Sequence, residues 1–224
     1  MKEQKTPVKI LIADDHEMLR DGFCSFISNQ PGLLFAGEAV NGLQLVELAE
    51  SLLPHIIFTD ISMPVMDGIE ATRTIKSRLP QINIIAYTMF NNHKMIIDMF
   101  DAGAKGYVIK TASKTELLDA IETVFQNKYY YCNATDLNLA KLIAGSNFDP
   151  RQPGNKVSFS LKEKEVIRLI CQEYFNKEIS KALHVSVRTV EGYRERIMEK
   201  MQARNVVGLV VYAIRYGIYT PEGM

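Results

Sequence analysis

The chain has 224 residues, of which 47% are hydrophobic, and its 26 Lys and Arg balance 26 Asp and Glu to a formal net charge of zero. This length and composition suit two packed domains of ordinary size, and no run of 18 apolar residues predicts a membrane-spanning helix. Residues 1–7 contain no apolar signal-peptide region, and the three cysteines lack the close spacing of metal ligands. We therefore expect a cytoplasmic protein with reduced thiols and no membrane association.

The charge is unevenly divided along the chain. Residues 157–224 contain 11 Lys and Arg against 8 Asp and Glu, a net charge of +3, which leaves −3 on the preceding residues. The basic C-terminal part is the part expected to approach a polyanion. A charge of this size is too modest to establish nucleic-acid binding by itself.

Residues 7–127 alternate between short apolar runs typical of strands and amphipathic runs typical of helices. Strands are predicted near 8–13, 33–39, 55–59, 82–87 and 106–109. Helices are predicted near 17–29, 42–52, 69–78, 93–101 and 114–127. Five such repeats predict an α/β domain with a doubly wound sheet of five parallel strands and helices on both faces.

Polar residues follow four of these strands. Asp14 and Asp15 end the first strand, Asp60 the third, Thr88 the fourth and Lys110 the fifth. The carboxyl ends of parallel strands line the ligand crevice of an open sheet. Carboxylates at this edge can hold Mg²⁺, whereas hydroxyl and ammonium groups can bind phosphate oxygens. One of the carboxylates can accept a phosphoryl group.

Two segments, IADDHEML around Asp14 and IIFTDISMPVMDG around Asp60, resemble the receiver domain of two-component response regulators. Thr88 follows Asp60 by 28 residues and Lys110 follows Thr88 by 22 residues, as in that family. The resemblance covers residues 7–127 and implies a flavodoxin-like fold. It also implies that Asp60 accepts a phosphoryl group from a partner histidine kinase, so that the protein is a regulator and not a dedicated enzyme.

The same resemblance implies roles for the residues around Asp60. The expected Mg²⁺ ligands are Asp15, Asp60 and the backbone carbonyl of Ser62, with Asp14 acting through water. Thr88 and Lys110 are expected to contact the phosphoryl group. Tyr107 is the expected switch aromatic, which turns inward when Thr88 moves towards the phosphoryl oxygens.

Several alternatives stay open at this point. Asp14 could instead cap the helix that follows it, a position that Asp favours. A phosphohydrolase on a similar sheet would use an Asp-x-Asp arrangement after the first strand, a spacing that Asp14-Asp15 lacks. A degenerate receiver that works without phosphorylation is the stronger rival, although every expected residue is present. Thr111 follows Lys110 where the family often has a cis proline, which leaves the geometry of that peptide bond open.

Residues 128–156 are predicted to form a linker. A short amphipathic helix is expected at 135–144, and the Gly-, Pro- and Asn-containing stretch at 145–155 is typical of a flexible connection.

Residues 157–219 predict a small all-α domain of four helices. Ser160 followed by Glu163 is a capping box that opens a helix ending near Gln172. Asn176 is expected to cap a short second helix. The third and fourth helices are predicted at 187–201 and about 205–216.

The short helix, tight turn and following helix within residues 176–195 form a helix-turn-helix unit. The segment LKEKEVIRLICQEYFNKEISKALHVSVRTVEGYRERIMEKM resembles the LuxR-type helix-turn-helix domain of the NarL/FixJ class of response regulators. This resemblance implies a transcription regulator that binds DNA. A four-helix domain that binds only protein is the alternative.

The third helix of this domain is the expected recognition helix. The spacing of Val190, Ile197 and Met201 marks its buried side, so the opposite face is expected to enter the major groove. Candidate DNA contacts are Lys177, Arg188, Thr189, Glu191, Gly192, Glu195, Arg196 and Lys200. The basic residues suit phosphate contacts, whereas Glu191 can accept a hydrogen bond from cytosine or orient a neighbouring arginine.

One recognition helix reads only a few base pairs, so we expect a homodimer on paired half-sites. The last helix has more apolar surface than one small core needs, and it is the candidate dimer contact. The four positions are Val206, Val207, Val210 and Tyr212. Simple packing of these side chains against the first helix of the domain is an equally weighted alternative.

Overall fold

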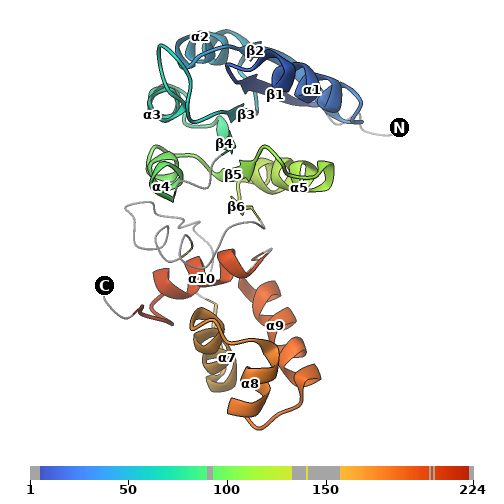
Figure 1. Ribbon diagram of the computed structural model, residues 1–224, viewed down its shortest axis with the longest axis vertical. Helices are drawn as coiled ribbons and strands as arrows, with labels where there is room; N and C mark the ends of the chain where they lie inside the picture. Colours follow the sequence, from blue (N-terminus) through green and yellow to red (C-terminus); the bar gives the residue numbers. More distant parts are fainter. Residues whose placement is uncertain are drawn as a thin grey trace. The chain divides into compact units, whose positions relative to one another are not determined.

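The structure is a computed structural model that describes residues 6–89, 93–132, 140, 157–201, 203 and 205–221. The chain divides into two compact units, Met1–Cys132 and Asn133–Met224 (Figure 1). Apart from residue 140, the predicted linker helix at 135–144 lies outside the described residues.

The first unit is built on one parallel sheet with the strand order β2-β1-β3-β4-β5-β6. Its strands are β1 (Val8–Ala13), β2 (Leu33–Ala39), β3 (Ile56–Thr59), β4 (Asn83–Thr88), β5 (Gly106–Ile109) and β6 (Tyr130–Tyr131). The central strands β3 and β4 are buried along their whole length, as expected where helices cover both faces. The strand order reverses between β1 and β3, and a ligand crevice is expected at the carboxyl ends there.

In the part of the first unit that the structure describes, five helices surround this sheet, and their predicted positions are confirmed. They are α1 (Glu17–Ser28), α2 (Gly42–Leu52), α3 (Gly68–Arg78), α4 (His93–Asp101) and α5 (Lys114–Phe125). One apolar cluster joins α1 and α5 to the sheet, with Phe23, Phe58 and Ile121 among its buried members. Helix α3 contacts both α2 and α4, and Figure 1 shows these three helices on the other side of the sheet. The doubly wound arrangement is thus the predicted one.

The sixth strand is a difference from the predicted five. In β6, Tyr130 and Tyr131 pair with Gly106 and Tyr107 of β5, and both tyrosines are buried. A strand of two residues is too short to show an alternating pattern in sequence. The sheet pairing carries the first unit past residue 127, where the sequence predicts its end, to Cys132.

The described part of the second unit is helical. It contains α7 (Leu161–Cys171), α8 (Asn176–Ala182), α9 (Val187–Met201) and α10 (Val206–Arg215). Helix α9 packs on α8, α7 and α10, and α7 packs on α10. The capping box is confirmed, because Glu163 N–H donates to Ser160 Oγ and the Glu163 carboxylate accepts from Ser160 N–H. Within the described residues, no helix has the length and apolarity needed to cross a bilayer.

The predicted cap of the second helix was wrong by one residue. Asn176 is the first residue of α8, and Phe175 occupies the capping position without a side-chain acceptor. The Phe175 N–H instead donates to the Glu178 carboxylate at 2.7 Å. Asn176 is a residue type that favours the N-cap position, so it predicted the wrong start for α8. The hydrogen bond at this helix start is accepted instead by Glu178, a residue inside the helix.

Candidate functional site

Backbone pairing brings three acids to one edge of the sheet. Asp14 N–H donates to the Ala39 carbonyl at 3.0 Å, and Asp60 N–H donates to the Ala13 carbonyl at 2.8 Å. These bonds extend the β1–β2 and β1–β3 pairing beyond the strand ends. Asp14 and Asp60 are buried, whereas the Asp15 side chain is 36% exposed. The predicted acid cluster therefore exists, and one of its carboxylates remains open to solvent.

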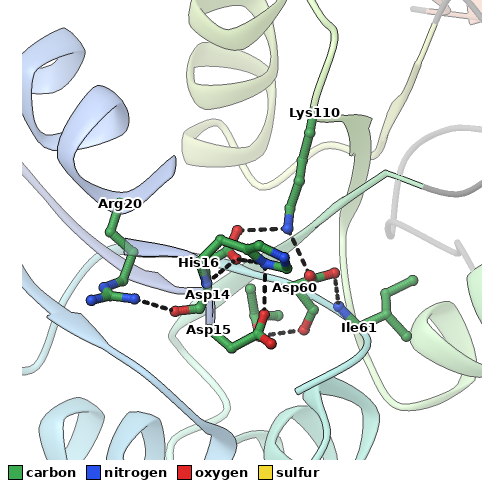
Figure 2. Close-up of polar contacts among 8 residues, drawn as sticks. Asp14, Asp15, His16, Arg20, Asp60, Ile61 and Lys110 are labelled. Carbon is green, nitrogen blue, oxygen red and sulfur yellow. Dashed lines mark hydrogen bonds and ion pairs between the residues drawn. The ribbon is translucent and has the colours of Figure 1, made fainter. Parts of the chain in front are cut away.

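Lys110 joins two of these carboxylates. Its Nζ lies 2.7 Å from Asp14 Oδ2 and 2.6 Å from Asp60 Oδ2, and its side chain is 1% exposed (Figure 2). The Lys110 N–H donates to the Thr88 carbonyl at 2.8 Å, which positions the lysine at the end of β5 beside β4. One buried cation thus faces two buried anions. Removing the ammonium, or removing both carboxylates, would leave an uncompensated buried charge.

The loop after Asp60 is held tightly against the strand end. Asp60 Oδ1 accepts from Ile61 N–H at 2.6 Å, and Gly68 N–H donates to the Ile61 carbonyl at 2.9 Å. A Cβ at Gly68 would lie 2.0 Å from the Asp60 carbonyl oxygen, so glycine is required there by close backbone approach. Ser62 follows in the exposed part of this loop. Its carbonyl remains a predicted metal ligand.

Arg20 supports the acid loop from α1, although sequence patterns did not single it out. Its guanidinium donates to the Asp14 carbonyl at 2.9 Å (Figure 2). It also lies 3.6 Å from Glu38. Arg20 is buried on the same side of α1 as Phe23 and Ile27. An arginine in line with an apolar stripe was the sequence signal for this contact.

The acid cluster fits a divalent cation. Ligand atoms of Asp14, Asp15, His16 and Asp60 all lie within 4.8 Å of one another. Carboxylate oxygens are hard ligands of the kind that Mg²⁺ prefers, and a cation would offset the repulsion between them. The sequence predicted the three carboxylates but missed His16, whose ring turns back towards Asp14 and Asp15.

The predicted switch residues lie on neighbouring strands. Thr88 ends β4 and is 2% exposed, and Tyr107 on β5 is 1% exposed. Burial raises the pKa of the Tyr107 phenol, and Cys132 adds to this effect. The ring is buried, and its role as the switch aromatic stays a prediction. The described residues contain no cis peptide bond, so the Lys110–Thr111 bond is trans.

The expected recognition helix presents most of its candidate residues to solvent. Val190, Ile197 and Met201 are buried as predicted. The exposed candidates are Lys177, Arg188, Thr189, Glu191, Glu195, Arg196 and Lys200, and Gly192 is half-buried. A Cβ at Gly192 would meet no atom within 4 Å, so packing does not explain this glycine. Their roles at DNA stay predictions.

Lys200 has a partner inside the second unit. Its Nζ lies 2.7 Å and 2.9 Å from the two carboxylate oxygens of Glu163, and 5.8 Å from the centre of the Phe159 ring. The hydrogen bond from Lys200 lowers the pKa of Glu163, and contacts with Ser160 add to this effect against the opposing effect of burial. A phosphate contact by Lys200 would therefore compete with an existing ion pair.

The four candidate dimer positions on α10 separate into two pairs. Val207 and Val210 are 4% and 0% exposed, which favours the packing alternative for these two residues. Val206 and Tyr212 are half-buried. Tyr212 lies between Phe159 and Tyr216, with the Tyr216 ring stacked at 4.2 Å. The dimer contact therefore stays a prediction that rests mainly on Val206 and Tyr212.

Two protein families match the chain over the two units. Residues 10–122 match the response regulator receiver domain, and residues 157–213 match the luxR family of bacterial regulatory proteins. The chain therefore belongs to the response regulators, which are not dedicated enzymes. Within them it is a DNA-binding regulator of the LuxR/NarL class.

Individual relatives span nearly the whole chain. The response regulator VraR of Staphylococcus aureus is 31% identical over 217 residues, which cover 94% of this chain and 98% of VraR. A structure of the RcsB response regulator from Salmonella typhimurium is 28% identical with a TM-score of 0.56, covering 92% of this chain and 98% of that chain. A structure of two RcsB dimers bound to two parallel DNAs is 27% identical with a TM-score of 0.56, covering 93% and 98%.

Proposed function

We propose that phosphorylation of Asp60 by a partner histidine kinase switches the binding of this regulator, as a dimer, to paired DNA half-sites. The observation that carries the proposal is the contact of a buried Asp60 carboxylate with Lys110, beside Asp14 and Asp15. Two anions around one buried ammonium leave an excess of negative charge at this edge. That excess suits a metal-assisted phosphoryl acceptor.

In the proposed transfer, a carboxylate oxygen of Asp60 attacks phosphorus as the bond to the kinase histidine nitrogen breaks. Asp15, Asp60 and the Ser62 carbonyl, with Asp14 acting through water, would hold Mg²⁺, which would supply positive charge for the phosphoryl oxygens. Lys110 exchanges its contact with Asp60 Oδ2 for a contact with a phosphoryl oxygen while Asp14 retains its ammonium neighbour. The Ile61 N–H holds Asp60 in place during this exchange.

The new charge is the proposed signal. A phosphoryl group adds about 1.5 to 2 negative charges at neutral pH. Thr88 is drawn towards it at the end of β4, and the Thr88–Lys110 backbone contact passes this movement to β5. We propose that Tyr107 turns inward into the space that Thr88 leaves, and that the surface formed by α4, β5 and α5 changes as a result.

The proposed output is dimeric DNA binding. The exposed Arg188, Arg196 and Lys177 are suited to phosphate contacts, and Glu191 and Glu195 lie exposed on the recognition helix. The structure of two RcsB dimers on DNA supports the proposal that this chain also binds DNA as a dimer. Binding should weaken as salt increases, because phosphate contacts release counterions.

The test uses acetyl phosphate and Mg²⁺ with the full chain. Wild-type protein is expected to gain one phosphoryl group, located at Asp60 by mass spectrometry, and Asp60→Asn none. Asp21→Asn changes an exposed aspartate on α1 and serves as the matched control. In gel shifts at fixed salt, phosphorylation should strengthen cooperative binding to two half-sites. Label at another residue, or monomeric binding indifferent to phosphorylation, would overturn the proposal.

A further inference from the structure

A cavity of about 260 Å³ lies within the second unit, and its lining includes none of the candidate DNA contacts. Its walls come from the chain just before α7, from an exposed side of α7, from the end of α10 and from the turn that follows α10. The volume is close to the lower limit of small-molecule sites, about 300 Å³, so it suits a ligand built around a single ring.

One wall of the cavity is aromatic. The Tyr216 ring is stacked on the Tyr212 ring, with centroids 4.2 Å apart and planes inclined by 26°. Phe159 meets Tyr212 edge-on at 6.1 Å. Phe159 is buried, whereas the two tyrosines are only half-buried. Flat ring surfaces left partly uncovered in this way suit a planar aromatic ligand.

The other wall has two positive charges. Lys164 and Arg168 line the cavity one turn apart on α7, and both are exposed. Like charges at this spacing are neighbours and repel each other. The lining contains no Asp or Glu, and within the described residues neither cation pairs with a carboxylate. An anion placed between the two side chains would relieve their repulsion.

The turn after α10 fixes the shape of the cavity. Gly217 has φ of 68°, and the chain then folds back so that Ile218 N–H and Tyr219 N–H both donate to the Ala213 carbonyl, at 2.8 and 3.1 Å. The Ile218 carbonyl in turn accepts from Arg168 Nε at 3.2 Å. These bonds hold the guanidinium at the rim and join the end of α10 to α7, so the cavity is formed before any ligand binds.

We propose that this cavity binds a small aromatic carboxylate, whose ring lies against the two tyrosines and whose carboxylate contacts Lys164 and Arg168. The planar guanidinium matches the two oxygens of a carboxylate, and the lysine adds a second charge-assisted contact. Tyr212 is also a candidate dimer contact, so a second copy of the chain is the competing occupant. A symmetric contact would bring the same two cations from each copy to one interface, which favours the anion. The inference is independent of phosphorylation at Asp60.

Titration of the isotope-labelled full chain, followed by NMR shifts of its backbone amides, tests the proposal with benzoate as the probe. Benzamide keeps the ring and the size of benzoate but is uncharged, and cyclohexanecarboxylate keeps the charge but lacks the planar ring. Lys164→Met removes one cation from the cavity. Lys162→Met is the matched control, because it changes an exposed lysine of the same helix that does not line the cavity.

Benzoate is expected to cause saturable shifts centred on Lys164, Tyr216 and Gly217. Benzamide should bind about tenfold more weakly, because it loses both charge-assisted contacts. Cyclohexanecarboxylate should bind about threefold more weakly than benzoate, because it cannot stack on the tyrosines. Lys164→Met should weaken benzoate about threefold without changing benzamide, and Lys162→Met should change neither.

Equal affinities for benzoate and benzamide would overturn the inference, and so would shifts centred elsewhere or no saturable shift. Equal losses for both ligands in Lys164→Met would also overturn it, because Lys164 would then only shape the cavity. Shifts at these amides that follow protein concentration, with no response to benzoate, would show that a second copy occupies the cavity and would contradict the proposed ligand.

Discussion

Each of the two units contains a lysine in contact with a buried carboxylate, but the balance of charge differs between them. In the receiver, the buried Lys110 ammonium contacts both Asp14 and Asp60. In the helical unit, Lys200 pairs with one carboxylate among the described residues, that of Glu163, which also accepts from Ser160 N–H. Glu163 is thus matched by one cation within its own unit, whereas the receiver keeps an excess of negative charge.

This difference separates a structural ion pair from a site prepared for chemistry. The Glu163–Lys200 pair joins the start of α7 to the end of α9, and its one positive charge balances its one negative charge. The receiver cluster satisfies its lysine but not all its carboxylates, so it can take a metal ion and a phosphoryl group. Changing the charge balance in each unit should therefore have different consequences.

The largest expected effect is that of Lys110→Met. Loss of the ammonium leaves Asp14 and Asp60 buried without a cation, which should lower the free energy of unfolding of the receiver by roughly 3 kcal/mol. Added Mg²⁺ should restore part of this loss, because a cation again neutralises the carboxylates. Hydrogen exchange of β4 amides, with and without Mg²⁺, measures the change.

Lys114→Met removes an exposed lysine at the start of α5 and is the control for Lys110→Met. Equal exchange rates in the two variants would contradict the role given to Lys110. A loss of unfolding free energy in Lys110→Met that added Mg²⁺ does not reduce would contradict the interpretation that the receiver cluster carries an excess of negative charge.

Lys200→Met should have a smaller effect, confined to the helical unit. Glu163 would lose its partner, but the Lys200 side chain is 40% exposed, so solvent already weakens this pair. We expect a loss of about 1–2 kcal/mol in the free energy of unfolding of this unit, independent of Mg²⁺. Hydrogen exchange of the α9 amides at increasing urea concentration measures this free energy, with Lys162→Met as an exposed control. A loss of unfolding free energy in Lys200→Met that depends on Mg²⁺ would contradict the proposed difference between the two units.

The pH dependence of the helical unit sharpens the same comparison. Because the folded-state pKa of Glu163 is lowered from its ordinary value of 4.5, the unfolded state binds the proton more tightly. The stabilisation is therefore complete above the unfolded pKa and is lost as pH falls through the lower folded pKa. Glu163→Gln should flatten stability against pH below 4.5, measured by thermal unfolding across this range. An unchanged slope would show that Glu163 does not titrate in this way.

The smallest expected effect concerns backbone strain, which also occurs in both units. Val65, in the loop after Asp60, has φ of 70°, and Glu173, after α7, has φ of 71°. A β-branched residue is the less tolerant of the two in this conformation. Val65→Gly should stabilise the receiver by roughly 0.5–1 kcal/mol, and Glu173→Gly should stabilise the helical unit by less. Thermal unfolding of the two variants decides it, and a larger gain for Glu173→Gly would contradict the ranking.

Sequence patterns correctly predicted the elements that are defined by a regular spacing of neighbouring residues. Apolar runs placed the first five strands within one residue of their observed ends, and the stripe of Val190, Ile197 and Met201 identified the buried side of α9. The capping box of Ser160 and Glu163 was correct because both partners lie within one helical turn. Patterns failed where the element was too short, as in β6, or where the capping hydrogen bond was accepted by a residue inside the helix, as by Glu178 in α8.

The sequence by itself determined that Asp14, Asp15, Asp60, Thr88 and Lys110 lie at one edge, because the carboxyl ends of parallel strands meet there. Only the tertiary structure decided which atoms pair. It directed Arg20 to the Asp14 carbonyl, turned His16 towards two carboxylates and joined Lys200 to Glu163, 37 residues away in sequence. It also buried Tyr107, Val207 and Val210. Strand and helix periodicities depend on neighbouring residues, whereas these contacts depend on how distant elements pack, which no local pattern encodes.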